Sequence, residues 1–217
     1  KESELRQKGK IAELALGYQG GVKALVSMGA YNMNLCESEL IEIVRAFRSS
    51  NTNIVKLWNT VEKAFIEAVN NKSIVHIDKN ISFIYEGNIL FIKLPSGRRL
   101  SYIRPKIDYN NAFNKSVITY EGVDSTTKKN TRLTTYGGKL VENIVQAIAR
   151  DVLGQAMINL RNKGFNIVMH VHDEIVLEVE NGVSSVEKVV EIMCEENRYL
   201  KGLKLRADGF ESNYYKK

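Results

Sequence analysis

The chain has 217 residues, of which 44% are hydrophobic, and this is enough apolar material for one large domain or two small ones. That content excludes a disordered tail, and no apolar run reaches the length of a membrane span. The formal net charge of +6 favours an anionic partner, most commonly nucleic acid, although an ordinary basic soluble protein has the same charge.

Two further features concern the chain as a whole. Cys36 and Cys194 are far apart in the sequence and are expected to be free thiols in a reducing compartment, although two cysteines alone also permit a disulfide. The chain begins at Lys1 without an initiator methionine, and a helical pattern starts at once. We therefore expect a piece cut from a longer protein.

The first third of the chain is predicted to be helical. Ser3 is expected to cap a helix that runs through Leu16, and the glycines at 17–21 interrupt it. Further helices are predicted over 22–28, 38–47 and 53–69. The last of them has a stripe of apolar residues at helical spacing, which predicts a buried face. The stripe consists of Ile54, Leu57, Trp58, Val61, Phe65 and Ala68.

The middle third changes to a period of two, which predicts strands. Segments 81–85 and 89–93 flank Glu86-Gly87-Asn88 and form a hairpin signal. Further strands are expected over 102–104 and 116–120. The polar residues at 128–132 are predicted to form a basic connector.

The last third mixes both patterns. A long helix is predicted over 140–161, with Gly164 in the C′ position, and a second helix over 186–194. Residues 203–207 are predicted to be a final edge strand. The whole pattern predicts an α+β fold, a helical subdomain followed by an antiparallel sheet backed by helices.

A strand-turn-strand pattern lies between those two helices. Two β-branched runs flank Asp173 and Glu174, and this places both carboxylates at the tip of a hairpin. A carboxylate held on a stiff turn is a natural ligand for a hard cation such as Mg²⁺. The alternation of His170, His172 and Asp173 also permits a zinc or manganese hydrolase, but further ligands are scarce because only His76 remains elsewhere. A lone strand histidine such as His170 is more often a packing residue.

The first helix carries a pair of cations on its polar face. At 100° per residue Arg6 and Lys10 point together, away from an apolar stripe that consists of Ile11, Ala12, Ala15 and Leu16. Two cations one turn apart are suited to a polyphosphate, and the ring of Tyr18, two turns beyond Lys10, could stack on a base or sugar. The alternative is a solvated helix with an ion pair between Lys10 and Glu13.

These segments resemble motifs of the A-family DNA polymerases, the pol I type, most closely their bacteriophage and prophage members. Arg6-x₃-Lys10-x₇-Tyr18 resembles motif B, and the sequence Val171-His-Asp-Glu174 resembles motif C, in the same order along the chain. Segment 138–153 resembles the palm helix that carries a DNA-contacting glutamine, here Gln146. The sequence Gly-Arg-Arg-Leu at 97–100 resembles the arginine segment that enters the palm.

The resemblance implies nucleotide contacts on the first helix. Arg6 and Lys10 would contact the triphosphate of an incoming dNTP, and Lys10 would also stabilise charge or deliver a proton at the leaving pyrophosphate. Tyr18 would lie under the nascent base pair. Leu14 would tune sugar discrimination, although many members have Phe or Tyr there, and Gln19 stands where a glycine is usual.

The resemblance implies catalytic roles for the acidic hairpin. Asp173 would bind the two Mg²⁺ ions of the complete enzyme, Glu174 would assist more weakly, and His172 would position the primer end. Gln146 would reach the minor groove of the primer-template, and Arg99 would also contact DNA. A surface glutamine and a solvated turn at Arg99 are the alternatives. The palm helix departs from the family at Glu142, where an amide is common, and at Gly138, where an arginine is usual.

The resemblance also implies the binding partners of this chain. Motif A, the other source of metal ligands, precedes motif B in the family, so a missing N-terminal part of the same polymerase is an expected partner, with primer-template DNA and dNTP.

The implied division is 1–72 as fingers helices that include motif B, 73–135 as a β-rich connection, and 136–217 as palm with motif C. The implied location is the cytoplasm of a bacterial or phage-infected cell, without a membrane partner. A non-catalytic nucleic-acid-binding module remains the third interpretation.

Overall fold

The computed structural model describes residues 2–33, 35–110 and 114–215. The chain forms two compact units, residues 1–145 and 146–217, and the boundary between them lies inside one long helix. Helices and a six-stranded antiparallel sheet together make an α+β fold, as predicted. The division into fingers, connection and palm stays a prediction.

The helices of the first unit follow the predicted periodicities, with ends shifted by a few residues. The first helix already begins at Glu2, so Ser3 lies inside it and the predicted cap is wrong. Where this helix meets α2, a small apolar core forms from Ala15, Leu16, Leu25, Ala30 and Leu40. The elements are α1 (Glu2–Leu16), α2 (Val22–Ser27), the 3₁₀ turn η1 (Ala30–Met33), α3 (Glu37–Ser50) and α4 (Thr52–Asn71).

The sheet of the first unit is an antiparallel meander in which each strand pairs with the next one along the chain. The predicted 81–93 hairpin is confirmed, and its two turn residues Gly87 and Asn88 both have positive φ, 56° and 66°, as a type I′ turn requires. The strands are β1 (Ile74–His76), β2 (Ser82–Glu86), β3 (Ile89–Lys93), β4 (Arg99–Asn110), β5 (Lys115–Val123) and β6 (Asn130–Thr135).

Two predictions for this sheet need correction. The strands expected at 102–104 and 116–120 are the central parts of much longer strands, β4 and β5. The connector expected at 128–132 is wrong in its second half, because β6 begins at Asn130 and pairs with β5. Polar exposed residues form a strand there because β5 offers free backbone groups for hydrogen bonds.

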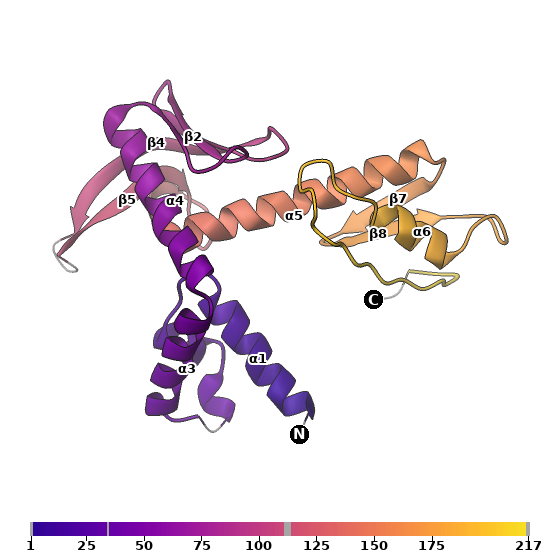
Figure 1. Ribbon diagram of the computed structural model, residues 1–217, viewed down its shortest axis with the longest axis horizontal. Helices are drawn as coiled ribbons and strands as arrows, with labels where there is room; N and C mark the ends of the chain where they lie inside the picture. The colour runs from indigo at the N-terminus through magenta and orange to yellow at the C-terminus, as the bar shows by residue number, and fades with distance from the viewer. Residues whose placement is uncertain (1, 34, 111–113, 216–217) are drawn as a thin grey trace. The chain divides into compact units, whose positions relative to one another are not determined.

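Helix α4 packs on one face of the sheet (Figure 1). Aromatic rings contribute to this contact. Phe65 is fully buried and meets Phe83 and Tyr102 edge to face, at centroid distances of 6.4 and 5.3 Å. Tyr102 continues to Tyr120 at 5.0 Å. Burial raises the pKa of Tyr102 to about 12, and the Asn143 amide that donates to its hydroxyl opposes the shift. Of the predicted stripe on α4, Trp58, Val61, Phe65 and Ala68 are buried, whereas Leu57 is exposed.

The second unit contains the rest of α5 (Gly137–Asn162), the hairpin of β7 (Asn166–Val171) and β8 (Glu174–Glu178), and α6 (Val186–Met193). Gly164 has a φ of 88°, and the N–H of Phe165 returns to the Leu160 carbonyl at 3.1 Å, so the predicted C-terminal glycine ends α5. The edge strand predicted at 203–207 is wrong. Its alternating pattern finds no partner strand among the described residues, and the segment has no regular structure.

Two features of the whole chain complete the description. Cys36 is an exposed free thiol and Cys194 a partly exposed one. None of the helices in the described ranges combines the length and the apolar character that crossing a membrane requires.

Candidate functional site

The cations of α1 lie on its exposed face. Arg6, Lys10 and Leu14 are exposed, whereas Ala15 and Leu16 on the other side are buried in the small core. Among the described residues neither Lys10 nor Glu13 makes an ion pair, so the alternative of a mutual Lys10–Glu13 pair is wrong. Lys10 is therefore available to an anion from solvent.

The segment that follows α1 is fixed by contacts to distant parts of the same unit. The indole N–H of Trp58 donates to the Gly17 carbonyl at 3.1 Å. Gln19 has a φ of 69°, in the left-handed region that favours glycine, and its Oε1 accepts the backbone N–H of Gly138 at 2.8 Å. Tyr18 lies between these two anchors and is partly buried. The position of its ring at the end of the cationic helix is thus set by tertiary contacts.

Two glycines at the start of α5 make this close approach to the α1 end possible. A Cβ on Gly138 would lie 2.2 Å from the Tyr18 carbonyl oxygen and 2.4 Å from the Gln19 Cβ. A Cβ on Gly137 would lie 2.3 Å from the Trp58 carbonyl oxygen. Gln19 and Gly138 are two positions at which the sequence departs from the motif pattern, and they are in contact with each other. An arginine at 138 would not fit this packing. Sequence reasoning missed this contact, for which two adjacent glycines at a helix start were the available signal.

We expect Gly138→Ala to lower the free energy of unfolding by about 1–3 kcal/mol, because the new methyl group meets backbone that cannot move aside. Gly154→Ala in the same helix is the matched control. It has nothing within 4 Å of the added Cβ, and the better helix propensity of alanine should raise stability by up to about 1 kcal/mol. Urea unfolding of both variants measures the difference. Equal stabilities would show that Tyr18 does not pack on Gly138.

The acidic turn of the second unit is a two-residue hairpin loop. Val171 pairs with Glu174, so His172 and Asp173 form the loop and Glu174 opens β8. The expectation that both carboxylates lie at the tip is thus correct only for Asp173. His172 has a φ of 52°. This left-handed conformation costs free energy in a residue other than glycine, and the strand pairing on both sides of the loop maintains it. All three side chains, His172, Asp173 and Glu174, are exposed.

The same turn contradicts the histidine-based metal site. The strand ends at Val171, so His172 does not continue the alternation that would place it beside His170. His170 instead lies against Arg150 of α5, with guanidinium nitrogens 3.3 and 3.4 Å from its two ring nitrogens. No three His, Cys, Asp or Glu side chains gather as a metal site in the part of the chain that the structure describes. Asp173 in the loop and Glu174 at the start of β8 remain exposed oxygen donors.

Sequence reasoning missed two residues that lie against this hairpin. Arg150 is the first, through its contact with His170. Tyr215, near the C-terminus, is the second, because its hydroxyl donates to Oε2 of Glu174 at 3.5 Å. Tyr215 lies 41 residues after Glu174 in the sequence, and no local sequence pattern predicts a contact between them.

The predicted DNA-contacting residues lie on different elements. Arg99 opens β4, pairs with Glu86 at 3.2 Å and covers the Phe91 ring at 5.3 Å. Gln146 is an exposed residue of α5. Arg6, Lys10, Leu14, Tyr18 and Arg99 belong to the first unit, whereas the second unit holds Gln146, His172, Asp173 and Glu174.

No protein-family model matches the chain, and no solved structure matches it. A curated relative is a protein named DNA polymerase from Bacillus phage SP02. The two sequences are 54% identical over 217 residues, which is 100% of this chain and 33% of the relative. The chain therefore spans about a third of the length of the relative that it matches.

Proposed function

We propose that this chain is the part of an A-family, phage-type DNA polymerase that carries the nucleotide-binding helix and one acidic segment of the catalytic centre. The reaction is template-directed nucleotidyl transfer from a dNTP to a primer 3′ hydroxyl. The similarity to a phage DNA polymerase over the full length of the chain is the observation that carries the proposal. It supports DNA synthesis as the general activity. The family type rests on the motif B and motif C patterns.

In this proposal the α1 cations bind the dNTP. Arg6 has a forked guanidinium for two phosphate oxygens, and Lys10 is a point charge one turn away. Both side chains are exposed, so the triphosphate can reach them from solvent. Lys10 also stabilises negative charge as the pyrophosphate leaves. Tyr18 supports the new base pair, and Leu14 contacts the sugar.

The acidic turn supplies carboxylate oxygens for Mg²⁺. Asp173 is the ligand and Glu174 assists it, while His172 orients the primer end. When bound, two Mg²⁺ ions would supply activation of the primer hydroxyl and neutralisation of the pyrophosphate. Asp173 lies in the loop, outside the hairpin ladder, and its side chain is exposed to solvent, where a substrate and a cation have access. Gln146 and Arg99 contact the primer-template.

We further propose that the complete catalytic centre needs polypeptide outside these 217 residues. Two observations support this. The relative is about three times as long as the chain. The apolar strand residues Ile167, Met169 and Ile175 remain partly exposed in a two-stranded sheet, which is marginal by itself.

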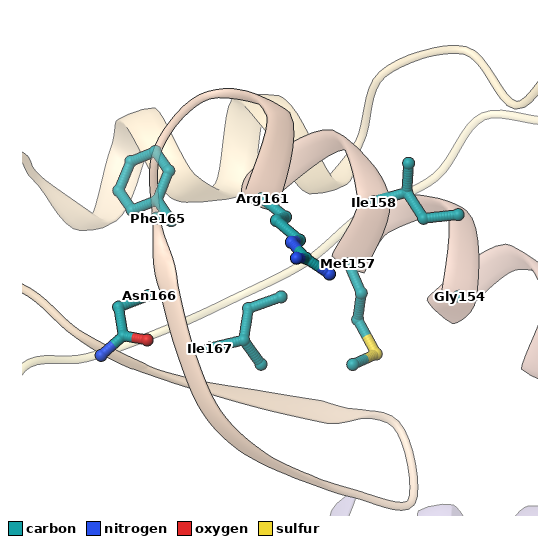
Figure 2. A pocket seen from close by; sticks show the side chains of 7 residues that line it. All are labelled: Gly154, Met157, Ile158, Arg161, Phe165, Asn166 and Ile167. Carbon is teal, nitrogen blue, oxygen red and sulfur yellow. The ribbon is translucent and has the colours of Figure 1, made fainter.

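A hollow on the second unit supports the same proposal. It measures about 590 Å³ and runs along the last turns of α5 and the start of β7 (Figure 2). Met157, Ile158 and Ile167 line it, and Ile158 is 51% exposed. An apolar surface of this kind is expected to be covered in the whole protein.

A primer-extension assay tests the proposed function. The longer protein that carries this chain is expected to incorporate templated nucleotides with Mg²⁺, whereas the purified 217-residue chain is expected to incorporate none. The reason is that a two-ion centre needs bridging carboxylates from at least two segments. Templated incorporation by the 217-residue chain would refute the need for further segments. An inactive longer protein that binds DNA would favour the nucleic-acid-binding module instead.

A further inference from the structure

The positive charge of the chain is concentrated in its β-rich segment. Residues 73–135 hold ten Lys and Arg against five Asp and Glu, a net charge of +5 out of the total of +6. The rest of the chain is almost neutral in sum. The sheet of β1–β6 is therefore the part of the molecule to which an anionic polymer would be drawn.

Strand register places many of these cations on the face of the sheet that α4 does not cover, here called the outer face. Lys93 of β3 lies opposite Arg99 of β4 in the strand register. On the same face, Ile103 of β4 lies opposite Glu121 of β5, and Glu121 lies opposite Arg132 of β6. Lys106 joins it opposite Thr119. The turn between β5 and β6 adds exposed Lys128 and Lys129 at the end of these strands.

The acidic residues of the outer face are already engaged within the sheet. Glu121 accepts from two arginines, Arg104 at 2.9 Å and Arg132 at 3.4 Å. The carboxylate of Asp108 accepts the Thr119 hydroxyl at 2.5 Å. Glu86 pairs with Arg99 at 3.2 Å.

The lysines, in contrast, have no such partner. Lys93, Lys106, Lys128 and Lys129 make no ion pair among the residues that the structure describes. Their ammonium groups are the charges that remain for an external anion.

The outer face has no aromatic platform. Phe91 is the single Phe, Tyr or Trp at its register positions in the described strands, and the Arg99 guanidinium covers that ring. Single-stranded nucleic acid is usually bound by stacking its bases on exposed aromatic rings. A cationic face without such rings fits the phosphate backbone of a duplex, which needs charge and no base stacking.

We propose that the outer face of the β1–β6 sheet, with the Lys128–Lys129 turn, is a binding surface for the phosphate backbone of duplex DNA. The proposal rests on the proposed function for the choice of DNA as the anion. It extends the DNA contact expected for Arg99 to a continuous surface over β3 to β6. Its role is to hold the substrate duplex without reading its sequence.

Fluorescence anisotropy with a labelled primer-template tests the surface in the 217-residue chain. The test variant replaces Lys93, Lys106, Lys128 and Lys129 by Gln. The matched control replaces four exposed lysines elsewhere, Lys56, Lys63, Lys201 and Lys204, by Gln and so has the same net charge. A third variant replaces the first four lysines by Arg, which keeps the charge. Circular dichroism checks the fold of each.

The Gln variant is expected to bind at least about tenfold more weakly at about 100 mM salt, with a salt slope reduced by about 0.9 for each phosphate that it no longer neutralises. The control and the Arg variant should bind as the parent does, and duplex should bind more tightly than a single strand of equal length. Unchanged affinity of the Gln variant, an equal reduction of affinity in the control, or preference for the single strand would overturn the proposal.

A parallel measurement in the longer protein separates this inference from the proposed function. The Gln variant should weaken primer-template binding there and leave the KM for dNTP unchanged. A raised KM for dNTP with unchanged DNA affinity would overturn the surface. Absence of all nucleotide incorporation by the unmodified longer protein would refute the polymerase assignment, while the anisotropy result for the sheet would still stand.

Discussion

Asp173→Asn in the longer protein is expected to lower the rate of nucleotide incorporation by about 10²–10³-fold or more. Asparagine keeps the size of the side chain but replaces a charged oxygen by a neutral amide, so the turn loses its strongest cation ligand. Asp173 is exposed on the hairpin loop and makes no ion pair among the described residues, so the fold and the binding of DNA should remain near parental. Single-turnover kinetics at saturating primer-template measures the effect.

The control for this variant is Asp208→Asn, the same chemical change at another exposed position of the same unit. The Asp208 carboxylate accepts only the backbone N–H of Gly209 at 3.0 Å in the described part of the chain, and an amide oxygen preserves that bond. Parental rates are expected for it. If Asp173→Asn retained turnover comparable to that of the control, the catalytic role of the turn would be wrong.

Lys10→Ala is expected to lower kcat/KM for dNTP by about 10²-fold, with KM raised and kcat reduced. The reason for both effects is that Lys10 would hold the triphosphate in the ground state and stabilise the pyrophosphate as it leaves. Because Lys10 is exposed and outside the core of its unit, stability should change little. Steady-state kinetics with one dNTP varied measures this, and urea unfolding checks the fold.

Lys8→Ala on the same helix is the comparison for Lys10→Ala. Lys8 lies two residues from Lys10, on a different side of α1. The pKa of Glu39 is lowered, chiefly by hydrogen bonds with Cys36 and also by the charge of Lys8. The Lys8→Ala variant should leave the dNTP kinetics unchanged. Parental KM and kcat for Lys10→Ala, or equal reductions in both variants, would contradict a specific phosphate contact.

Periodicity predicted the helices and the first hairpin well, because these elements bury a regular face. The apolar stripe on α4 and the Gly87–Asn88 turn are local signals, and both are found in the structure. The misses at 128–132 and 203–207 have one cause. A strand exists only where another strand offers hydrogen bonds, and neither polarity nor alternation reveals whether that partner is present.

The candidate site was predicted to a similar degree. The exposed face of α1 with Arg6 and Lys10, and the loop position of Asp173, follow from local patterns that the structure reproduces. The contacts that fix these segments could not be predicted from local sequence patterns. The packing of Gly138 on Tyr18 joins positions about 120 residues apart, and it depends on how α5 approaches the end of α1.

The sequence by itself determined the α+β class, the amphipathic helices, the concentration of positive charge in residues 73–135 and the acidic hairpin, because each depends on neighbours along the chain. Only the tertiary structure decided that His172 leaves the strand of His170, that Gln19 meets Gly138, and that four lysines remain without an ion pair, among the described residues, on or beside one sheet face. The physical reason is that strand pairing, close backbone approach and charge neutralisation are contacts between residues far apart in sequence. Local composition does not fix such contacts.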